Sequence, residues 1–336
     1  MAETQYTVCI LTVTYGDRWH LLEQVLRRAN GFLQVTDIVV VDNASVYDVA
    51  AKANEIGSGK ITVLISKENL GSAGGYKKAM EYAVNSTGAD LFLLLDDDNL
   101  PQENVIDDLL KQWQATPGVN DKKALFCFRD DRRPHVIIAK GEDPYRFYLV
   151  PDNFLGFHLF RIISNKLRKT KDKQFTGMPL KERAIMPYVP YGGLMIHRDM
   201  IGAIGFPDER FYLYVDDSEF TYRITQHGGR IWMIPACRII DIDKSQGINY
   251  KKQLFHDQLL DEWSFRTYYH VRNRIYFYSR VAIQNKFIFR LNKLIYLAWL
   301  WIISLLSNKT VEYKKLVQAV NDGIDGKLGK ADPAKF

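Results

Sequence analysis

The chain has 336 residues, of which 47% are hydrophobic, so it can form one large globular domain with an appendage, or two domains. Its 45 Lys and Arg residues exceed its 39 Asp and Glu residues by six. The excess is concentrated between residues 271 and 315, where nine basic residues stand against one acidic residue. This distribution argues against a generally basic nucleic-acid-binding protein and predicts an anionic partner for the C-terminal region.

The first third of the chain alternates apolar, β-branched runs with amphipathic helical patterns. Strands are predicted at residues 7–14, 37–41, 61–65 and 91–95, and helices at residues 19–29, 46–55, 73–83 and 102–113. This alternation implies right-handed βαβ crossovers and a mostly parallel sheet with helices on both faces. We therefore expect an α/β fold with a ligand site beyond the carboxyl ends of the strands.

Three adjacent carboxylates, Asp96, Asp97 and Asp98, directly follow the apolar run 91–95. Adjacent charges at the rim of a sheet need a cation or hydrogen-bond donors to compensate them. Alternate residues of an extended segment point the same way, so Asp96 and Asp98 can face one ion. Hard oxygen ligands suit Mg²⁺ or Mn²⁺, and an ion held by two carboxylates can also bind phosphate oxygens. The spacing predicts a diphosphate bound through a metal, with a solvated acidic turn as the alternative.

The middle of the chain predicts the remainder of the sheet and a second acidic group. Residues 158–177 have little periodicity and are expected to form a mobile surface loop. A strand at 194–197 and a helix at 198–204 precede a strand-like run at 211–215. That run ends in Asp216 and Asp217, where carboxylates favour the start of a helix. Strands at 230–234 and 238–242 are expected to close the sheet.

The C-terminal region predicts helices, one of which is strongly apolar. The uncharged stretch 294–306 has 13 residues, fewer than the ~20 of a membrane-spanning helix, so it should lie on a membrane surface or in a core. Aromatic rings at headgroup depth and cations near anionic lipid would suit a membrane surface. The residues concerned are Arg290, Lys293, Tyr296, Trp299 and Trp301. Packing on the catalytic domain or in an oligomer interface is the alternative.

These patterns divide the chain into a catalytic domain at residues 1–245, a helical region at 246–316 and a polar tail at 317–336, of which residues 325–336 should fray. The N-terminus lacks the basic region of a signal peptide, and the three cysteines are scattered in apolar runs. A reducing cytoplasm therefore fits best, with peripheral attachment to the inner face of the cell membrane.

Four segments, in this order, resemble the family 2 glycosyltransferases with the GT-A fold. Residues 12–18 resemble the first nucleotide-binding loop, 39–45 the base-binding aspartate segment, 69–75 the Asn-x-Gly-x-x-Gly-Gly turn, and 96–98 the metal motif. The resemblance implies a nucleotide-sugar donor in the form of a UDP-sugar, and Mn²⁺ or Mg²⁺ as cofactor. The donor-binding residues that it implies are Thr12, Tyr15, Arg18, Asp42, Asn69, Gly75, Asp96, Asp97 and, if its helix returns to the cleft, Arg272.

Residues 214–228 resemble the acidic motif of the bacterial galactofuranosyltransferase branch, which builds cell-envelope glycans on lipid carriers. By that resemblance Asp217 is the general base, Asp216 orients the acceptor, and Glu219 and Gly193 contact the acceptor. Residues 268–273 also resemble an element that follows the catalytic domain in this branch and in related rhamnosyltransferases.

The branch often has a metal-binding histidine about two dozen residues after the acidic motif. This chain has Asp241 near that place and Asp243 after it. A carboxylate, with Asp241 the first candidate, is therefore expected to join Asp96 and Asp98 as a metal ligand.

The implied reaction is the inverting transfer of galactofuranose from UDP-galactofuranose to a lipid-linked glycan. The metal neutralises the departing diphosphate while Asp217 accepts the proton of the attacking hydroxyl. A rhamnosyltransferase or other hexosyltransferase of the same family is one alternative, and a catalytically inactive, membrane-associated glycan-binding protein is another. A nucleotidyltransferase would need a glycine-rich, basic loop after the first strand, and residues 15–18 offer little of it. The oligomeric state is left open.

Overall fold

The structure, a computed structural model, describes residues 6–243, 250 and 253–336. The chain forms two compact units. The first contains residues 1–144, 179–209 and 217–245, and the second contains residues 145–178, 210–216 and 246–336. The expected boundary between residues 245 and 246 lies outside the described residues.

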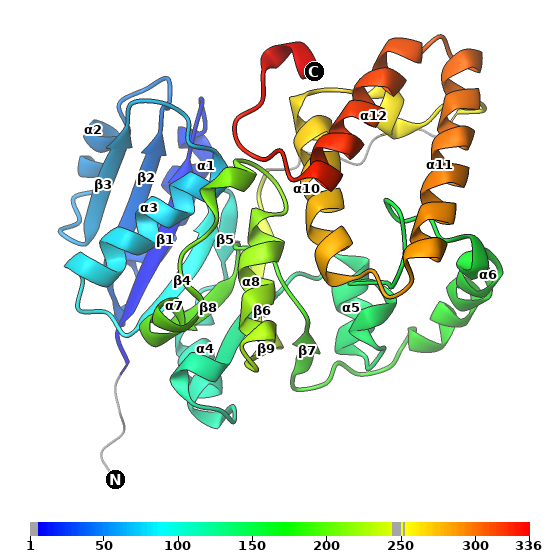
Figure 1. The fold of residues 1–336 in the computed structure, drawn as a ribbon. Helices are drawn as coiled ribbons and strands as arrows, with labels where there is room; N and C mark the ends of the chain where they lie inside the picture. The colour runs from blue at the N-terminus through cyan, green and yellow to red at the C-terminus, as the bar shows by residue number, and fades with distance from the viewer. Residues whose placement is uncertain (1–5, 244–249, 251–252) are drawn as a thin grey trace. The chain divides into compact units, whose positions relative to one another are not determined.

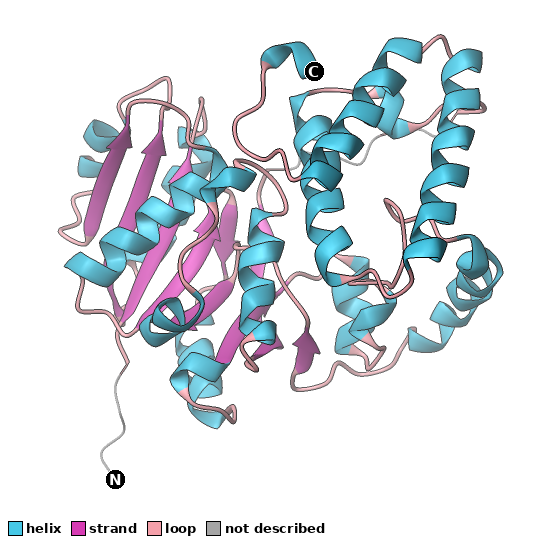
Figure 2. Cartoon of the chain, viewed as in Figure 1, coloured by secondary structure: helices cyan, strands magenta, loops and turns pink. Residues whose placement is uncertain are grey.

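The first unit is built on a sheet to which the described residues contribute nine strands, in the order β3-β2-β1-β4-β8-β6-β9-β5, with β7 paired to β9 (Figures 1 and 2). The strands are β1 (Val8–Thr14), β2 (Val35–Asn43), β3 (Ile61–Ser66), β4 (Leu91–Asp96), β5 (Asn99–Pro101), β6 (Lys123–Phe128), β7 (Ala184–Met186), β8 (Leu194–His197) and β9 (Arg230–Asp241). Strands β1 to β4 are parallel to one another, and β6 is parallel to β9. Strands β5, β7 and β8 are antiparallel to their neighbours, so the sheet is mixed.

Helices cover both faces of this sheet, as predicted. They are α1 (Trp19–Asn30), α2 (Val49–Asn54), α3 (Gly71–Ser86), α4 (Val105–Ala115), α5 (Arg133–Ala139), α7 (Arg198–Ile204) and α8 (Asp216–Gln226). Ile10 and Leu93 belong to one core cluster with buried side chains of α1 and α4. On the opposite face, α3 approaches β1 so closely that a Cβ at Gly75 would lie 2.7 Å from Val13. Alternate strand residues point to opposite faces, so β4 is apolar throughout because both of its faces are buried.

The second unit is mainly helical and has its own core. Its helices are α6 (Ile162–Lys171), α9 (Gln258–Asp261), α10 (Phe265–Val281), α11 (Lys286–Leu306) and α12 (Thr310–Asp325). Short 3-10 turns in the chain lie at Asn120–Lys122, Pro144–Arg146, Leu159–Arg161, Asp172–Phe175, Glu209–Phe211 and Pro333–Lys335. Buried Tyr268, Leu300 and Leu316 join α10, α11 and α12 in one hydrophobic cluster.

Three local expectations were wrong. Residues 158–177 contain helix α6 instead of forming a loop throughout. Residues 211–215 are not a strand, and Tyr212, Tyr214 and Val215 have left-handed φ angles between 64° and 66°. The two strands expected at 230–242 are one strand, β9, whose register against β6 shifts between Cys127 and Phe128. Pro235, which lacks an N–H group, lies in the part of β9 where the pairing is interrupted.

Residues 325–336 were expected to fray, and this expectation was wrong. The C-terminal residues are packed on α10 and α12. The Ala331 N–H donates to the Tyr269 hydroxyl (2.7 Å), and Lys335 forms an ion pair with Asp322 (2.8 Å). The Phe336 ring lies 5.7 Å from the Tyr268 ring. The contact between the Phe336 and Tyr268 rings and the ion pair between Lys335 and Asp322 therefore hold the tail in place.

Helix α11 is longer than its uncharged stretch suggested. Its 21 residues, with a mean hydropathy of 1.4 over the most apolar window, satisfy the length and composition of a membrane span. It is the one such helix in the described part of the chain, and core helices of soluble proteins meet the same criteria. The expectation that this segment is too short to cross a membrane is therefore not supported by its length.

Candidate active site

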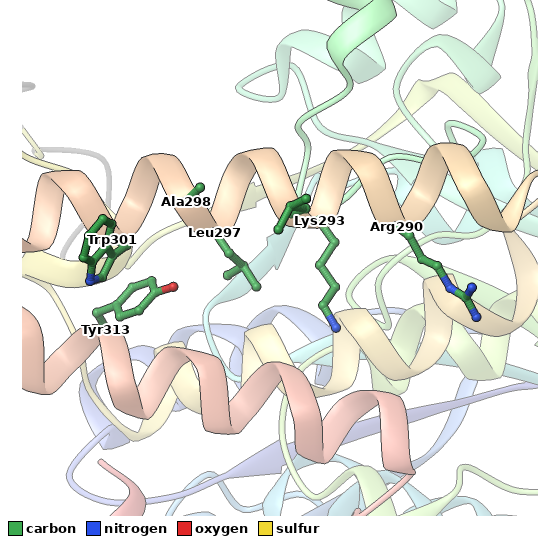
Figure 3. Close-up of a pocket in the computed structure, with 7 residues that line it drawn as sticks. Arg290, Lys293, Leu297, Ala298, Trp301 and Tyr313 are labelled. Carbon is green, nitrogen blue, oxygen red and sulfur yellow. The ribbon is translucent and has the colours of Figure 1, made fainter.

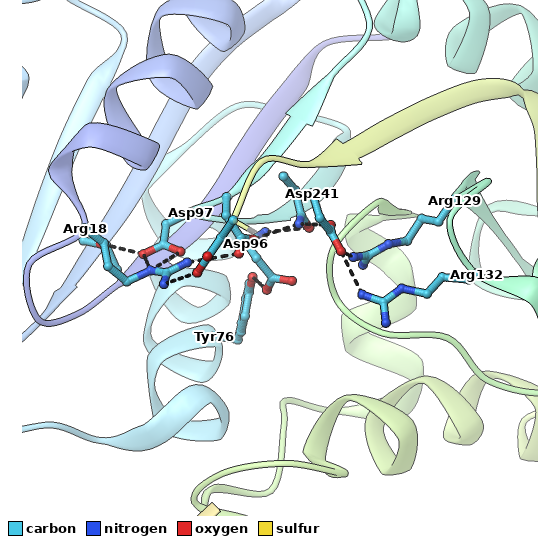
Figure 4. A network of polar contacts seen from close by, with 11 residues as sticks. Arg18, Tyr76, Asp96, Asp97, Arg129, Arg132 and Asp241 are labelled. Carbon is cyan, nitrogen blue, oxygen red and sulfur yellow. Dashed lines mark hydrogen bonds and ion pairs between the residues drawn. The ribbon is translucent and has the colours of Figure 1, made fainter. Parts of the chain in front are cut away.

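The acidic triplet lies at the carboxyl end of β4, beside the loop that follows β1. These strands are parallel neighbours, with Val13 opposite Asp96, so residues that follow them meet at one edge of the sheet. The Arg18 Nε donates to both carboxylate oxygens of Asp97, each at 2.9 Å. Its other two nitrogens contact Asp98 (3.0 Å) and Asp243 (2.8 Å). Arg18 therefore compensates three carboxylates at once (Figure 4).

Burial raises the proton affinity of these carboxylates. It raises the pKa of Asp97 to about 7, although the Arg18 charge and the Thr14 hydroxyl, which donates to Asp97 (2.8 Å), act in the opposite direction. Burial and the charge of Asp96 likewise raise the pKa of Asp98. One guanidinium thus compensates the cluster only in part, and an added divalent cation would be stabilised there.

Asp96 faces a tightly packed region. The Tyr76 hydroxyl from α3 donates to Asp96 Oδ1 (2.9 Å), as Figure 4 shows, and Tyr76 is buried against the Tyr191 ring at 4.1 Å. A Cβ at Gly192 would lie 2.7 Å from Asp96 Oδ2 and 1.9 Å from Asn99 Oδ1. Only glycine leaves room for these two oxygens.

Asp241 lies near the triplet but is already paired. Strand β5 brings Asn99 opposite Asp241, and the Asn99 amide donates to Asp241 Oδ1 (2.9 Å). Arg129 and Arg132 both contact Asp241 Oδ2, the latter at 2.8 Å (Figure 4). Arg129 is buried, and its Nε is without a hydrogen-bond partner among the described residues. The ligand role of Asp241 stays a prediction, and this structure holds its carboxylate with two arginines.

The site fits a divalent cation of the magnesium or manganese type. No group of three or more His, Cys, Asp or Glu side chains in the described residues could hold a metal unaided. Mg²⁺ and Mn²⁺ are commonly held by one or two carboxylates together with substrate phosphates. The oxygen donors of Asp96 and Asp98, two residues apart at the carboxyl end of β4, agree with that type of site. The partial charge compensation by Arg18 agrees with it as well.

Asp217 lies in the first turn of α8. Its Oδ1 accepts hydrogen bonds from the Ser218 N–H (2.6 Å) and hydroxyl (3.1 Å). Burial chiefly, with the charge of Asp96 adding to it, raises the pKa of Asp217 to about 6. Glu219 forms an ion pair with Arg223 one turn later (3.2 Å). Asp216 is buried and belongs to the second unit, while Asp217 and Glu219 belong to the first.

The expected nucleotide-binding residues occupy neighbouring strand ends. Asp42 and Asn43 are the last two residues of β2. The Asp42 Oδ1 accepts a hydrogen bond from the Ser45 N–H (2.8 Å). Asn69 Oδ1 accepts from the Gly71 N–H (2.8 Å), which shapes the start of α3. The partly exposed Tyr15 ring lies 5.7 Å from the Arg18 guanidinium. Tyr15, Asp42 and Asn69 therefore lie at or just after the carboxyl ends of β1, β2 and β3.

Three expected site residues are held within the fold. Thr12 is fully buried in β1. Gly193 is bonded in the sheet: its N–H donates to Leu94 O (2.8 Å), and its carbonyl accepts from Cys127 (2.9 Å). Arg272, in the second unit, is buried. The structure thus brings Tyr15, Arg18 and the acidic triplet together, while these three residues have structural contacts of their own.

Residues 9–168 match the family model "Glycosyl transferase family 2". The match covers 160 of the 336 residues, so this part of the chain is similar to the family 2 glycosyltransferases. The family match and the α/β sheet confirm the predicted GT-A fold class.

Two curated proteins are similar to the chain. The galactofuranosyltransferase GlfT1 of Mycolicibacterium smegmatis is 26% identical over 224 residues, which is 66% of each chain. A low-salt glycan biosynthesis hexosyltransferase of Haloferax volcanii is 23% identical over 305 residues, which is 89% of this chain and 86% of that protein.

Solved structures are also similar to the chain. GalNAc-T7 with UDP, GalNAc and Mn²⁺ aligns with a TM-score of 0.49 and 14% identity, over 70% of this chain and 44% of that one. TarS residues 1–349 from S. aureus align with a TM-score of 0.46 and 13% identity, over 69% of this chain and 59% of that one.

Several residues that shape the candidate site were missed from the sequence. Tyr76, Gly192, Arg129 and Arg132 reach Asp96 or Asp241, and none of them belongs to a motif identified in the sequence. The run after β6 that carries the two arginines offered a signal, because it is polar and follows an apolar strand. Tyr76 lies in a helix whose neighbouring motif is glycine-rich, so no sequence feature distinguished it from a core tyrosine.

Proposed function

We propose that the protein transfers galactofuranose from UDP-galactofuranose to a lipid-linked cell-envelope glycan with inversion, in a reaction that needs Mn²⁺ or Mg²⁺. The observation that carries the proposal is the acidic triplet at the carboxyl end of β4, which Arg18 compensates only in part, in the same unit as Asp217. Burial raises the pKa of Asp217 to about 6. A base with a pKa near the working pH accepts a proton most effectively. The similarity to a galactofuranosyltransferase supports the choice of donor sugar.

The roles of the chain's own residues follow from their contacts. Asp96 and Asp98 would hold the cation, which supplies charge compensation for the leaving diphosphate. Arg18 would keep Asp97 and Asp98 in place, as it does through its hydrogen bonds here. Asp217 would accept the proton of the acceptor hydroxyl as that oxygen attacks the anomeric carbon. One displacement from the face opposite the leaving group inverts the configuration.

We further propose that α11 attaches the protein to the inner face of the cell membrane. A groove on the second unit is lined by Arg290, Lys293, Leu294, Leu297, Ala298, Trp301 and Tyr313 (Figure 3). The side chains of Leu294 and Trp301 are 67% and 51% exposed, which places apolar surface beside the two cations. Apolar area with adjacent cations favours an anionic lipid surface. Tyr296 does not share this surface, because its ring packs on Phe157 at 5.6 Å.

The donor can be tested with a panel of nucleotide sugars. Binding of UDP-galactofuranose, UDP-galactose, UDP-glucose and dTDP-rhamnose would be measured by calorimetry with and without Mn²⁺. We expect UDP-galactofuranose to bind with the highest affinity, and only with the metal. Turnover would then be followed as UDP release with a membrane lipid extract as the source of acceptor. Metal-independent binding, or preference for another sugar, would contradict the respective part of the proposal.

A hexosyltransferase of the same family is the second candidate. The observation that favours it is the similarity to the Haloferax volcanii hexosyltransferase over 89% of this chain, a longer alignment than that with the galactofuranosyltransferase. Preference for a pyranose donor in the same panel would support this candidate. A protein that binds glycans without catalysing transfer would release no UDP with any donor.

A further inference from the structure

The segment 210–216, which we name the strap, has an unusual backbone and leads directly into α8. Tyr212, Tyr214 and Val215 all have φ angles in the left-handed region. The Leu213 N–H donates to Phe211 O (2.8 Å), which closes a tight three-residue turn around Tyr212. Turns of this hand are rare and strained, and a β-branched residue such as Val215 seldom adopts a positive φ. Such conformations persist only where surrounding contacts hold them.

One side chain of α10 provides three of those contacts. The Asn273 Nδ2 lies 2.9 Å from Phe211 O, 2.8 Å from Leu213 O and 2.9 Å from Tyr214 O. Asn273 is fully buried, and its Oδ1 accepts from the Arg272 Nε (2.9 Å). A single amide nitrogen thus contacts three carbonyl oxygens of the strap, including those on both sides of the tight turn.

The neighbours of Asn273 on α10 contact the same segment. The Arg272 Nη2 donates to Phe211 O (3.2 Å). The Tyr269 ring lies 5.0 Å from the Tyr212 ring, and the His270 ring lies 6.3 Å from the Tyr214 ring. The run 268–273, whose purpose the sequence did not reveal, therefore binds the strap through both its polar and its aromatic side chains.

We propose that Asn273 is a positioning residue for glycosyl transfer, because by fixing the strap it sets the orientation in which α8 begins and thereby that of the Asp217 carboxylate. The proposal rests on the general-base role proposed for Asp217. Val215 is separated from Asp217 by one residue, so a change in its φ or ψ redirects the first turn of α8. A displacement of a catalytic group by about 1 Å can reduce a rate by about 100-fold.

The substitution Asn273→Asp tests the proposal because it keeps the shape of the side chain and removes its N–H donors. We expect kcat with UDP-galactofuranose, per folded molecule, to fall by roughly 10- to 100-fold. The dissociation constant of the donor should not change, because the acidic triplet and Arg18 are untouched. This split between rate and donor binding separates positioning from a general loss of structure.

A matched control is Asn292→Asp in the same unit. Asn292 is also fully buried, and its amide donates to Asp152 O (2.9 Å) while its oxygen accepts from the Leu159 N–H (2.9 Å). We expect this variant to lower the melting temperature and to leave kcat per folded molecule within twofold of wild type. An equal loss of kcat in both variants would overturn the positioning role.

A double-mutant cycle shows whether Asn273 acts through Asp217. If it does, Asn273→Asp should cause no further loss of kcat in an Asp217→Asn background. The same fold loss in both backgrounds would overturn the proposal. Full activity of Asn273→Asp beside an inactive Asp217→Asn would overturn the positioning role alone and leave the general base intact. Full activity of Asp217→Asn would refute the base, and the positioning role with it.

If Asn273→Asp does not fold, Asn273→Ala provides the second test. Hydrogen exchange of a peptide that covers residues 210–217 would be measured in Asn273→Ala and in Asn292→Ala. Faster exchange of this peptide only in Asn273→Ala, together with a loss of kcat, supports the proposal. Unchanged exchange, or faster exchange with unchanged kcat, overturns it.

Discussion

Replacing Arg18 by Met should destabilise the protein in a manner that depends on pH and on divalent cations. The Arg18 side chain is 14% exposed, and its partners Asp97, Asp98 and Asp243 are 6%, 15% and 8% exposed. Removing one partner of a buried ion pair costs about 3–5 kcal/mol, because the remaining charge is left uncompensated. For a chain of 336 residues that corresponds to a fall in melting temperature of about 4–7 °C.

The pH dependence follows from the direction of the pKa shifts. The folded protein raises the pKa of Asp97 from 3.8 to about 7, so the folded state binds this proton more tightly than the unfolded state. The stability contributed by this proton is fully present below the unfolded pKa and is lost as the pH rises through about 7. Without Arg18 the pKa of Asp97 rises further. The destabilisation by Arg18→Met should therefore be larger at pH 8 than at pH 5.

Differential scanning fluorimetry at pH 5 and pH 8, with and without 1 mM Mn²⁺, would measure both effects. Bound Mn²⁺ should restore part of the stability at pH 8, because it compensates the carboxylates that Arg18 no longer contacts. Arg27→Met is a matched control, since Arg27 forms an exposed pair with Glu23 that contributes about 0–1 kcal/mol. A melting temperature of Arg18→Met equal to that of wild type at pH 8 would refute the reasoning.

Two further substitutions test the metal and the membrane. Asp98→Asn should abolish Mn²⁺-dependent donor binding in calorimetry while the metal-free melting temperature holds or rises, because one of several repelling charges is removed; unchanged donor affinity would contradict the metal assignment. Arg290→Glu with Lys293→Glu should release much of the protein from anionic phosphatidylglycerol vesicles, since each surface cation contributes about 1 kcal/mol. The control double variant Lys52→Glu with Lys111→Glu, in the first unit, should not release the protein from these vesicles. Equal sedimentation of both double variants with the vesicles would show that α11 does not attach the protein to a membrane.

The parts of the fold that repeat a local pattern could be predicted from the sequence. Strands β1 to β4 and the helices between them were predicted close to their observed bounds, because each apolar run alternates with an amphipathic helix. Strand β5 was missed, since three residues carry no periodicity, and its position is set by pairing with β9. The strap was predicted as a strand because its residues are aromatic and apolar, and tertiary contacts from Asn273 override that preference.

The candidate site was predictable where its residues follow a strand in the sequence. The acidic triplet and Arg18 are brought together because β1 and β4 are parallel neighbours. The pairing of Asp241 with Arg129 and Arg132 could not be predicted, because it depends on how β9 lies between β6 and β5. Arg272 was expected to be a diphosphate contact and is instead bonded to Phe211 O and Gly329 O within the second unit.

The most direct test of the proposed mechanism is turnover by Asp217→Asn. The amide has nearly the shape of the carboxylate but cannot accept the proton, so kcat should fall by about 10²–10⁴-fold while the dissociation constant of the donor is retained. In wild type, kcat/KM should decline as the pH falls through about 6, where the Asp217 carboxylate of the free enzyme becomes protonated. A variant that keeps kcat within a few fold of wild type, or a larger loss in Asp216→Asn with donor binding retained, would contradict the assignment of Asp217 as the general base.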